Sequence, residues 1–335
     1  MIMTHTTPGE RALASLTGLA LGDALGMPTQ SMSREQIRAD YGTITGMIDA
    51  GPHQEIAHGM PAGSITDDTE QALLLAEHLI AGNGEVNVTE FAHALLAWEA
   101  DMAARGSLDL LGPSTKAALE RLTAGVPASE SGKFGTTNGA AMRVAPIGIA
   151  HPVDNIADFV DAVAHTAEVT HNTTLGIASA SAVGAMVSAG VAGASLTEAL
   201  DIAVAAAAEG EKRGNWIAGG SISHRLRWAL NWLPTVPVSE REDALYHVIG
   251  TSVASQESVV AAIALASLSE DPWDTLCLAA GLGGDTDTVA AIHGAVLGAV
   301  HGPDAWPSDA VELVTRVNTL NLPHTSEALL ALRLR

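Results

Sequence analysis

The 335-residue sequence contains little cysteine, few basic residues and few aromatic side chains. Its one cysteine, Cys277, excludes an intramolecular disulfide and a zinc site built on paired thiolates, and it fits a reducing cytosol. Only 16 lysines and arginines stand against 38 aspartates and glutamates, which gives a formal net charge of −22. Such a field repels phosphate backbones and anionic lipids, so we expect no nucleic-acid partner and no membrane partner. Cations, in contrast, are attracted.

The sequence also has no recognisable secretory signal and no typical membrane span. Its first residues show no basic region followed by an apolar one, so we expect a cytoplasmic protein. The nearest approach to a membrane span is the uncharged stretch at residues 171–197, where Ala, Gly and Ser outnumber large aliphatic residues. Because transfer of such a stretch into lipid gains little free energy, it predicts a buried helix of a folded domain.

The residues that are abundant predict an all-α fold. Hydrophobic residues make up 47% of the chain, which is enough for a large core. Apolar residues recur at helical spacing, as in Leu73, Ala76 and Ile80, whereas alternating strand patterns are scarce. The breaks rich in glycine and proline are short, and none resembles a long linker. We therefore expect a single compact multi-helical domain over residues 1–335, with its motif-bearing core at about residues 11–302.

Two short segments combine glycines, carboxylates and hydroxyls before an apolar helix: residues 63–70 (GSITDDTE) and residues 281–288 (GLGGDTDT). Helix capping explains either segment taken alone, because Asp and Thr accept hydrogen bonds from free N–H groups. Capping does not require this density of acids in both. Four aspartates with nearby threonines form an all-oxygen ligand set, which suits Mg²⁺, Mn²⁺ or Ca²⁺ better than zinc. If the two helix starts face each other, they can hold two such ions.

Five segments carry a resemblance to a known family. In chain order they are Gly18–Gly26 (GLALGDALG), Gly63–Glu70, Thr137–Arg143 (TNGAAMR), Thr170–His171 and Gly283–Thr288 (GGDTDT). Together they resemble the ADP-ribosylglycohydrolase family, which includes the dinitrogenase-reductase-activating and ADP-ribosylarginine hydrolases. The resemblance implies an all-α fold of that type and two divalent cations, Mg²⁺ or Mn²⁺. It also implies a metal-dependent glycosidase that cleaves the bond at ribose C1 of ADP-ribosylated substrates and releases ADP-ribose.

The resemblance also implies roles for individual residues. The implied metal ligands are Thr66, Asp67, Asp68, Asp285, Asp287 and Thr288, of which Asp67 and Asp287 are also assigned to catalysis. The implied phosphate-cradling loop comprises Gly135, Thr136, Thr137, Asn138 and Gly139, whose backbone N–H groups can hold anions. Arg143 and His171 match residues that line the site. Without the family, an internal ion pair is the alternative for Arg143 and a helix cap is the alternative for His171.

The acid that transfers a proton is placed less directly. The segment SLDLLGPST at residues 107–115 resembles a family segment in which an Asp precedes a Gly and a helix-starting Thr, which makes Asp109 the candidate. Asp101 is the nearby competitor. A positioned carboxylate can protonate the leaving group or activate water as oxocarbenium character develops at the anomeric carbon. The alternative role for Asp109 is to cap the helix that begins near Pro113.

One position departs from the family pattern. In many relatives the segment GDALGxxxE ends in a Glu that reaches the metals and the ribose, whereas residues 22–30 here read GDALGMPTQ. The amide oxygen of Gln30 can bind a hard cation and the ribose, but it brings no charge and cannot act as a base. Asp23 can compensate for the lost charge or pair locally with neighbouring groups.

Three functions follow as hypotheses. The first is hydrolysis of an ADP-ribosylated protein, with ADP-ribosyl-arginine as the expected linkage, or of a small ADP-ribosyl compound. The second keeps the site but acts on a nucleoside or another small riboside, which Gln30 makes plausible. The third is a non-catalytic, crystallin-like member of the family. Four motif aspartates argue against the third, because packing alone does not require buried like charges. A monomer or a homodimer is expected.

Overall fold

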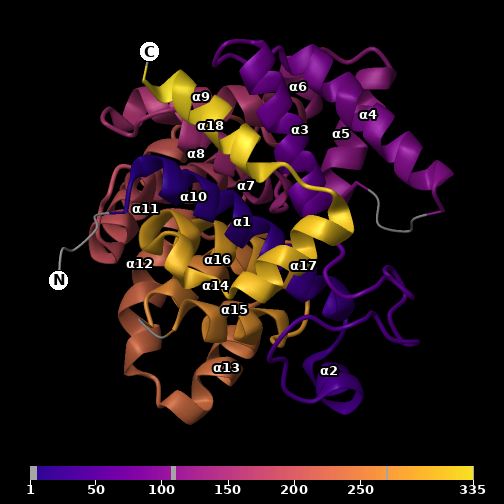
Figure 1. The fold of residues 1–335 in the computed structure, drawn as a ribbon. Helices are drawn as coiled ribbons and strands as arrows, with labels where there is room; N and C mark the ends of the chain where they lie inside the picture. The colour runs from indigo at the N-terminus through magenta and orange to yellow at the C-terminus, as the bar shows by residue number, and fades with distance from the viewer. Residues whose placement is uncertain (1–5, 107–110, 269–270, 335) are drawn as a thin grey trace.

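The computed structural model describes residues 6–106, 111–268 and 271–334, and in these residues helices are the only regular elements apart from three isolated β-bridges (Figure 1). The first half contains α1 (Pro8–Gly26), η1 (Met27–Thr29), α2 (Arg34–Tyr41), α3 (Asp67–Ala81), α4 (Val88–Ala104), α5 (Pro113–Thr123), α6 (Ala128–Ser131), α7 (Gly139–Met142), α8 (Ala145–Ala150) and α9 (Ile156–His171). The second half contains α10 (Thr174–Val191), α11 (Leu196–Gly210), α12 (Ile222–Trp232), η2 (Leu233–Thr235), η3 (Val238–Glu240), α13 (Arg241–Asp243), η4 (Ala244–Ile249), α14 (Ser255–Ala266), α15 (Pro272–Ala280), α16 (Thr286–His301), η5 (Pro303–Ala305), α17 (Ser308–Asn318) and α18 (Leu322–Arg333). The predicted all-α class is confirmed.

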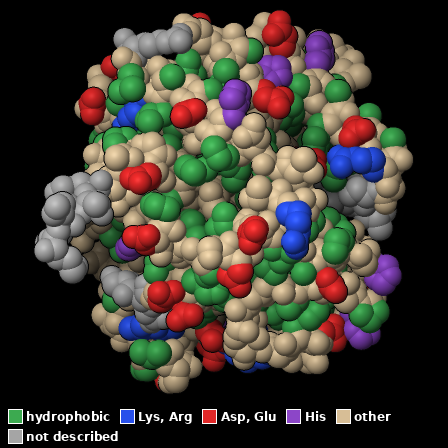
Figure 2. Space-filling view, in the orientation of Figure 1, with side chains coloured by type: hydrophobic (Ala, Val, Ile, Leu, Met, Phe, Trp, Pro, Cys, Tyr) green, Lys and Arg blue, Asp and Glu red, His purple; other side chains and the backbone are tan. Residues whose placement is uncertain are grey.

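The centre of the fold is α10, which packs against α8, α9, α11 and α16 (Figure 1). This helix is long and apolar enough to cross a membrane by length and composition, yet 94% of it is buried inside the protein. Its small side chains let the neighbouring helices approach closely. The sequence predicted a buried helix in residues 171–197, and the structure confirms it with narrower bounds, since α10 ends at Val191. Outside the core, Figure 2 shows many carboxylates and few lysines or arginines on the face in view.

Helices α1 and α16 lie side by side although they are about 270 residues apart in the sequence (Figure 1). Glycines make this contact possible. A Cβ atom built on Gly22 of α1 would lie 2.0 Å from the carbonyl oxygen of Ala290, and one built on Gly26 would lie 2.4 Å from the Cα atom of Asp287. The glycines of the GLALGDALG segment are therefore packing residues, and they place the end of α1 directly against the acidic start of α16.

We expect Gly22→Ala to destabilise the protein strongly, because its methyl group meets the rigid backbone of Ala290. Overpacking of this kind costs about 3 kcal/mol or more when backbone must move. The matched control is Gly46→Ala, since nothing lies within 4 Å of a Cβ built on Gly46. Urea unfolding of the two variants measures the difference. Equal stability of both variants would show that α1 and α16 can separate at little cost.

The buried face of α3 differs from the predicted one. Of the three apolar residues that defined the expected face, Ala76 is buried, whereas Leu73 and Ile80 are only partly buried. The inward face instead follows the positions Asp68, Ala72, Leu75 and Leu79, all of which are buried. The helix is therefore rotated about its axis relative to the expected face, and the side chain of Asp68 in its first turn is buried.

His293 on α16 is a buried histidine that is held neutral. Its Nδ1 donates a hydrogen bond to the Ala262 carbonyl at 2.9 Å, and its Nε2 lies 2.9 Å from Thr275 Oγ1. Burial lowers the pKa of His293 from 6.5 to about 4. Because the unfolded chain takes up the proton first, the contribution of His293 to stability is complete above pH 6.5 and is lost as the pH falls toward 4.

We therefore expect about 3 kcal/mol of stability to disappear over this interval through His293 alone. Urea unfolding of the wild type and of His293→Gln at pH 7.5 and pH 4.5 checks this expectation. The variant is expected to lose less stability than the wild type on acidification. Parallel losses in the two proteins would contradict the assignment.

Candidate functional site

A cavity of about 160 Å³ lies where the N-termini of four helices meet. Asp67 begins α3, while Gly112, Asn138 and Asp285 are the N-cap residues of α5, α7 and α16. The residues lining the cavity are Gln30, Ser31, Ile56, Asp67, Gly112, Pro113, Thr115, Thr137, Asn138, Gly139, Met142, Val253, Asp285, Asp287 and Thr288. No lysine, arginine or tryptophan is among these lining residues. The cavity thus combines carboxylates with helix N-termini, which attract anions through their free N–H groups.

The N-terminus of α3 is held by a carboxylate from another helix. Asp23 in the last third of α1 is fully buried, and its two oxygens accept hydrogen bonds from the backbone N–H and the hydroxyl of both Thr66 and Thr69. The bond from Thr66 Oγ1 is 2.7 Å long. Burial raises the pKa of Asp23 to about 6, against the lowering effect of the hydrogen bonds from these threonines. Asp23 therefore holds the first turn of α3 in place and is not among the residues that line the cavity.

Asp68 joins the two acidic segments. Thr288 Oγ1 at the start of α16 donates a hydrogen bond of 3.2 Å to Asp68 Oδ2, so the two segments that the sequence expected to face each other are in contact. The other oxygen, Oδ1, is buried without a hydrogen-bond partner. Burial raises the pKa of Asp68 well above its ordinary value, and the carboxylates of Asp287 and Asp67 raise it further. A cation bound beside Asp68 would oppose this shift, because it favours the charged carboxylate.

The second acidic segment depends on two glycines in the left-handed region. Gly283 and Gly284 have φ values of +89° and +82°, and a Cβ built on Gly284 would lie 2.5 Å from the Thr251 carbonyl oxygen. That same carbonyl accepts the backbone N–H of Asp285 at 2.7 Å. The side chain of Asp285 accepts a hydrogen bond from Asn138 Nδ2. Burial raises the pKa of Asp285, while the bonds from Asn138 and Thr288 oppose the change.

The loop at residues 135–139 is clamped on both sides. A Cβ built on Gly135 would lie 2.1 Å from the Thr170 carbonyl oxygen, so the loop touches the end of α9 directly. On the other side, the carbonyl of Thr136 accepts the Ser255 N–H at 3.1 Å, and the N–H of Asn138 donates to the Val253 carbonyl at 3.0 Å. Of the five predicted loop residues, Thr137, Asn138 and Gly139 line the cavity, and Gly135 and Thr136 support them.

Arg143 and His171 lie behind the cavity wall. Both are almost completely buried, and neither is among the lining residues. His171 Nε2 is 3.0 Å from Thr137 Oγ1, so the buried His171 contacts the loop from the interior of the protein. Burial lowers the pKa of His171 well below 6.5, and Arg143 lowers it further. Burial also lowers the pKa of Arg143 to about 10, partly offset by Asp67.

Gln30 occupies the place that the family pattern assigns to a glutamate. It is 5% exposed and lines the cavity, and its backbone carbonyl accepts a hydrogen bond of 3.0 Å from Gln54 Nε2. The Nε2 atom of Gln30 is buried without a hydrogen-bond partner. A buried amide that the protein leaves unsatisfied is available to a ligand.

The donor set fits hard cations through a mixture of oxygen types. Among the described residues, no group of three or more His, Cys, Asp or Glu side chains is arranged to hold one ion. The carboxylates instead alternate with threonine hydroxyls and the Gln30 amide, and Asp68 Oδ1 is left without a partner. Oxygen ligands of this kind suit Mg²⁺ or Mn²⁺.

Of the two candidates for proton transfer, the structure describes Asp101 but not Asp109. Asp109 lies outside the described residues, so its role stays a prediction. Asp101 is on α4 with a side chain that is 66% exposed, and it forms an ion pair of 2.9 Å with Arg105. The structure therefore does not bring Asp101 to the cavity.

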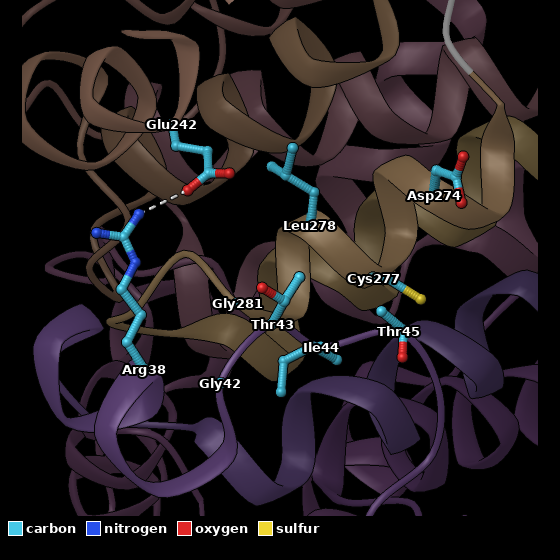
Figure 3. Close-up of a pocket in the computed structure, with 10 residues that line it drawn as sticks. All are labelled: Arg38, Gly42, Thr43, Ile44, Thr45, Glu242, Asp274, Cys277, Leu278 and Gly281. Atoms are coloured by element: carbon cyan, nitrogen blue, oxygen red, sulfur yellow. Dashed lines mark hydrogen bonds and ion pairs between the residues drawn. The ribbon is translucent and has the colours of Figure 1, made fainter. Parts of the chain in front are cut away.

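A larger cavity of about 330 Å³ lies between α2, α15 and residues 42–45 (Figure 3). It contains none of the predicted site residues, and Arg38 and Glu242 form an ion pair of 2.9 Å at its edge. Burial raises the pKa of Cys277, which lines this cavity, to about 12. The thiol is therefore uncharged at neutral pH and a poor nucleophile.

Sequence reasoning missed two groups of supporting residues. Thr251, Val253 and Ser255 link the Gly283–Gly284 turn to the loop at residues 135–139, and their residue types carry no chemical signal. Gln71 donates a hydrogen bond of 2.9 Å from Nε2 to Asp67 Oδ2. Its position could have indicated this contact, because residues four apart share a helix face.

Comparison with known proteins identifies the family of this protein. The profile of the ADP-ribosylglycohydrolase family matches residues 4–334. The chain is 33% identical to the uncharacterized protein YegU of Escherichia coli K12 over 96% of both chains. It is 28% identical to the ADP-ribosylarginine hydrolase Tri1 of Pseudomonas putida, over 91% of this chain and 74% of Tri1. A solved structure of an ADP-ribosylglycohydrolase-related protein complex superposes with a TM-score of 0.72 at 25% identity, covering 97% of this chain and 98% of the other. The chain belongs to the ADP-ribosylglycohydrolase family.

Proposed function

We propose that this protein hydrolyses the glycosidic bond at ribose C1 of ADP-ribosylated substrates, with ADP-ribosyl-arginine as the preferred linkage. Membership of the family supports an ADP-ribosyl glycohydrolase, and Tri1 supplies a relative named for the arginine linkage. The observation that carries the proposal is the contact between Asp68 and Thr288, which brings the two acidic helix starts together at one cavity.

The proposed cofactors are two Mg²⁺ or Mn²⁺ ions. The residues that would hold them are Thr66, Asp67, Asp68, Asp285, Asp287 and Thr288. When bound, such ions supply Lewis-acid polarisation and orient ribose oxygens or a water molecule. The buried, unpartnered Asp68 Oδ1 and the absence of lysine or arginine from the described cavity lining support this proposal.

Residues of the protein would orient the diphosphate and the ribose of the substrate. The N-termini of α5 and of α7, which begins at Gly139, would offer N–H groups to the diphosphate. The N–H groups of Thr137 and Asn138 already donate to Ser114 Oγ and the Val253 carbonyl. Asp67 and Asp287 would stabilise the positive charge that develops at C1, and the predicted acid Asp109 would move the proton. Gln30 would bind the ribose through hydrogen bonds without acting as a base, because its amide does not titrate.

The test is release of ADP-ribose from an ADP-ribosyl-arginine peptide, compared with adenosine and inosine as small ribosides. We expect turnover of the peptide in Mg²⁺ or Mn²⁺, none in EDTA, and recovery when the metal is restored. Asp67→Ala, Asp287→Ala and Asp109→Ala should each lose turnover. Cleavage of nucleosides alone would favour the small-riboside alternative, for which the neutral Gln30 is the supporting observation. Cleavage of neither substrate would favour a non-catalytic protein.

A further inference from the structure

A chain of buried hydrogen bonds begins at Asp67 and leads away from the cavity. Gln71 on the next turn of α3 donates from Nε2 to Asp67 Oδ2 at 2.9 Å. The other end of the same amide, Oε1, accepts a hydrogen bond of 3.3 Å from Arg143 Nη1. Gln71 is 0% exposed and Arg143 is 1% exposed, so water does not replace either bond without the interior opening.

The chain continues from Arg143 to the loop at residues 135–139. Arg143 Nη2 donates to Thr170 Oγ1 at 2.6 Å, and that hydroxyl lies 2.9 Å from His171 Nδ1. His171 Nε2 lies 3.0 Å from Thr137 Oγ1, which faces the cavity. Thr170 and His171 are both 0% exposed. The hydrogen bonds therefore run without interruption from an acidic residue of α3 to a hydroxyl of the loop.

Arg143 fixes which groups donate and which accept in this series of hydrogen bonds. A guanidinium group only donates hydrogen bonds, so Gln71 must turn its oxygen toward Arg143 and its NH₂ group toward Asp67. The opposite amide orientation would place two donors against each other. Arg143 also stacks over the Phe91 ring, with 5.5 Å between Cζ and the ring centroid, which restricts its movement. Along this path, a shift of Asp67 passes to Thr137 through groups that are each held on two sides.

We propose that Gln71 and Thr170 are positioning residues that couple a cation bound at Asp67 to the loop hydroxyl of Thr137. This inference rests on the proposed function, because it takes Asp67 as a metal ligand. Neither residue lines the cavity, so both act through their neighbours. Removal of such outer partners costs about 10- to 100-fold in metal affinity in other proteins.

The experiment follows the ring nitrogens of His171 by ¹⁵N NMR during titration with Mg²⁺ in the absence of substrate. In the wild type we expect the His171 signals to move as Mg²⁺ binds, because His171 is the link before Thr137. Gln71→Met should abolish this movement and raise the Mg²⁺ dissociation constant about tenfold. His293 is an internal reference, because it contacts Ala262 and Thr275 and takes no part in the hydrogen bonds that link Asp67 to Thr137.

A second variant, Thr170→Val, keeps the proposal testable if Gln71→Met does not fold. Thr170→Val keeps the side-chain shape and breaks the chain beyond Arg143, so it should also abolish the His171 response. The matched control is Ser179→Ala. It removes a buried hydroxyl whose only hydrogen bond within residues 6–106, 111–268 and 271–334 is to the Gly176 carbonyl of its own helix. The control should behave as the wild type.

The outcomes separate the two proposals. If the wild type binds Mg²⁺ and cleaves its substrate while both variants keep the wild-type His171 response and metal affinity, the coupling proposal is overturned and the proposed function stands. If the wild-type protein binds neither Mg²⁺ nor Mn²⁺, both are overturned. Loss of the response in both variants, with the control unchanged, supports the coupling.

Discussion

Asp68→Asn is expected to stabilise the metal-free protein and at the same time to abolish metal-dependent hydrolysis. The reason is that Asp68 is a buried carboxylate beside Asp287 and Asp67, with one oxygen that has no hydrogen-bond partner. An asparagine keeps the shape and still accepts the bond from Thr288. It removes the like charge beside Asp287 and Asp67.

The expected gain in unfolding free energy without metal is about 1 to 3 kcal/mol. The expected loss of hydrolysis is about 10³-fold or more, because weakened cation binding removes several kcal/mol of transition-state stabilisation. Thermal unfolding in EDTA and in Mg²⁺, together with release of ADP-ribose, measures both effects. In the wild type Mg²⁺ should raise the melting temperature, and in the variant this rise should be small.

The control for this prediction is Asp101→Asn, which neutralises an exposed carboxylate away from the cavity. It should leave both the melting temperature in EDTA and the hydrolysis close to those of the wild type. A variant at position 68 that is less stable than the wild type in EDTA would mean that Asp68 stabilises the fold without a cation. The four acidic residues would then be structural.

The sequence predicted the helical class and the meeting of the two acidic segments, and physical reasons explain both successes. Glycines and small residues in α1, α10 and α16 have few uses other than close helix packing. Gly26 packs α1 against Asp287 of the second acidic segment, and Asp23 of α1 binds Thr66 and Thr69 of the first. Repeated acids next to hydroxyls are costly in a core unless something compensates them. The pattern therefore contained information about the site as well as about the fold.

What the sequence did not reveal depends on contacts between distant residues. Asp23 could be assigned either to compensation for Gln30 or to local pairing, and only the packing of α1 against α3 shows that it accepts bonds from Thr66 and Thr69. The rotation of α3 was also missed, since an apolar count ignores a buried acid such as Asp68. Arg143 was expected at the site, but its depth behind the wall is set by neighbours that the motif does not contain.

Asp23→Ala is expected to cause the largest loss of stability among substitutions near the site. The change leaves two backbone N–H groups and two hydroxyls at the start of α3 without their acceptor, in a place that water does not reach. We expect a loss of about 3 kcal/mol or more in unfolding free energy. Asp23→Asn should also destabilise, because its NH₂ group would face an N–H donor that cannot reverse.

The same substitution should weaken cation binding beyond its effect on folding. In the wild type Thr66 gives its hydroxyl proton to Asp23, so the oxygen lone pairs remain available to a cation. Without Asp23, that hydroxyl is free to rotate and the first turn of α3 loses its anchor. Calorimetric titration with Mn²⁺ at a temperature where the variant is folded should show a dissociation constant raised about tenfold or more. The comparison is Asp49→Ala, which removes an exposed carboxylate that accepts one backbone N–H, from Ala62. If both variants lose similar stability and keep wild-type Mn²⁺ affinity, Asp23 does not organise the metal ligands.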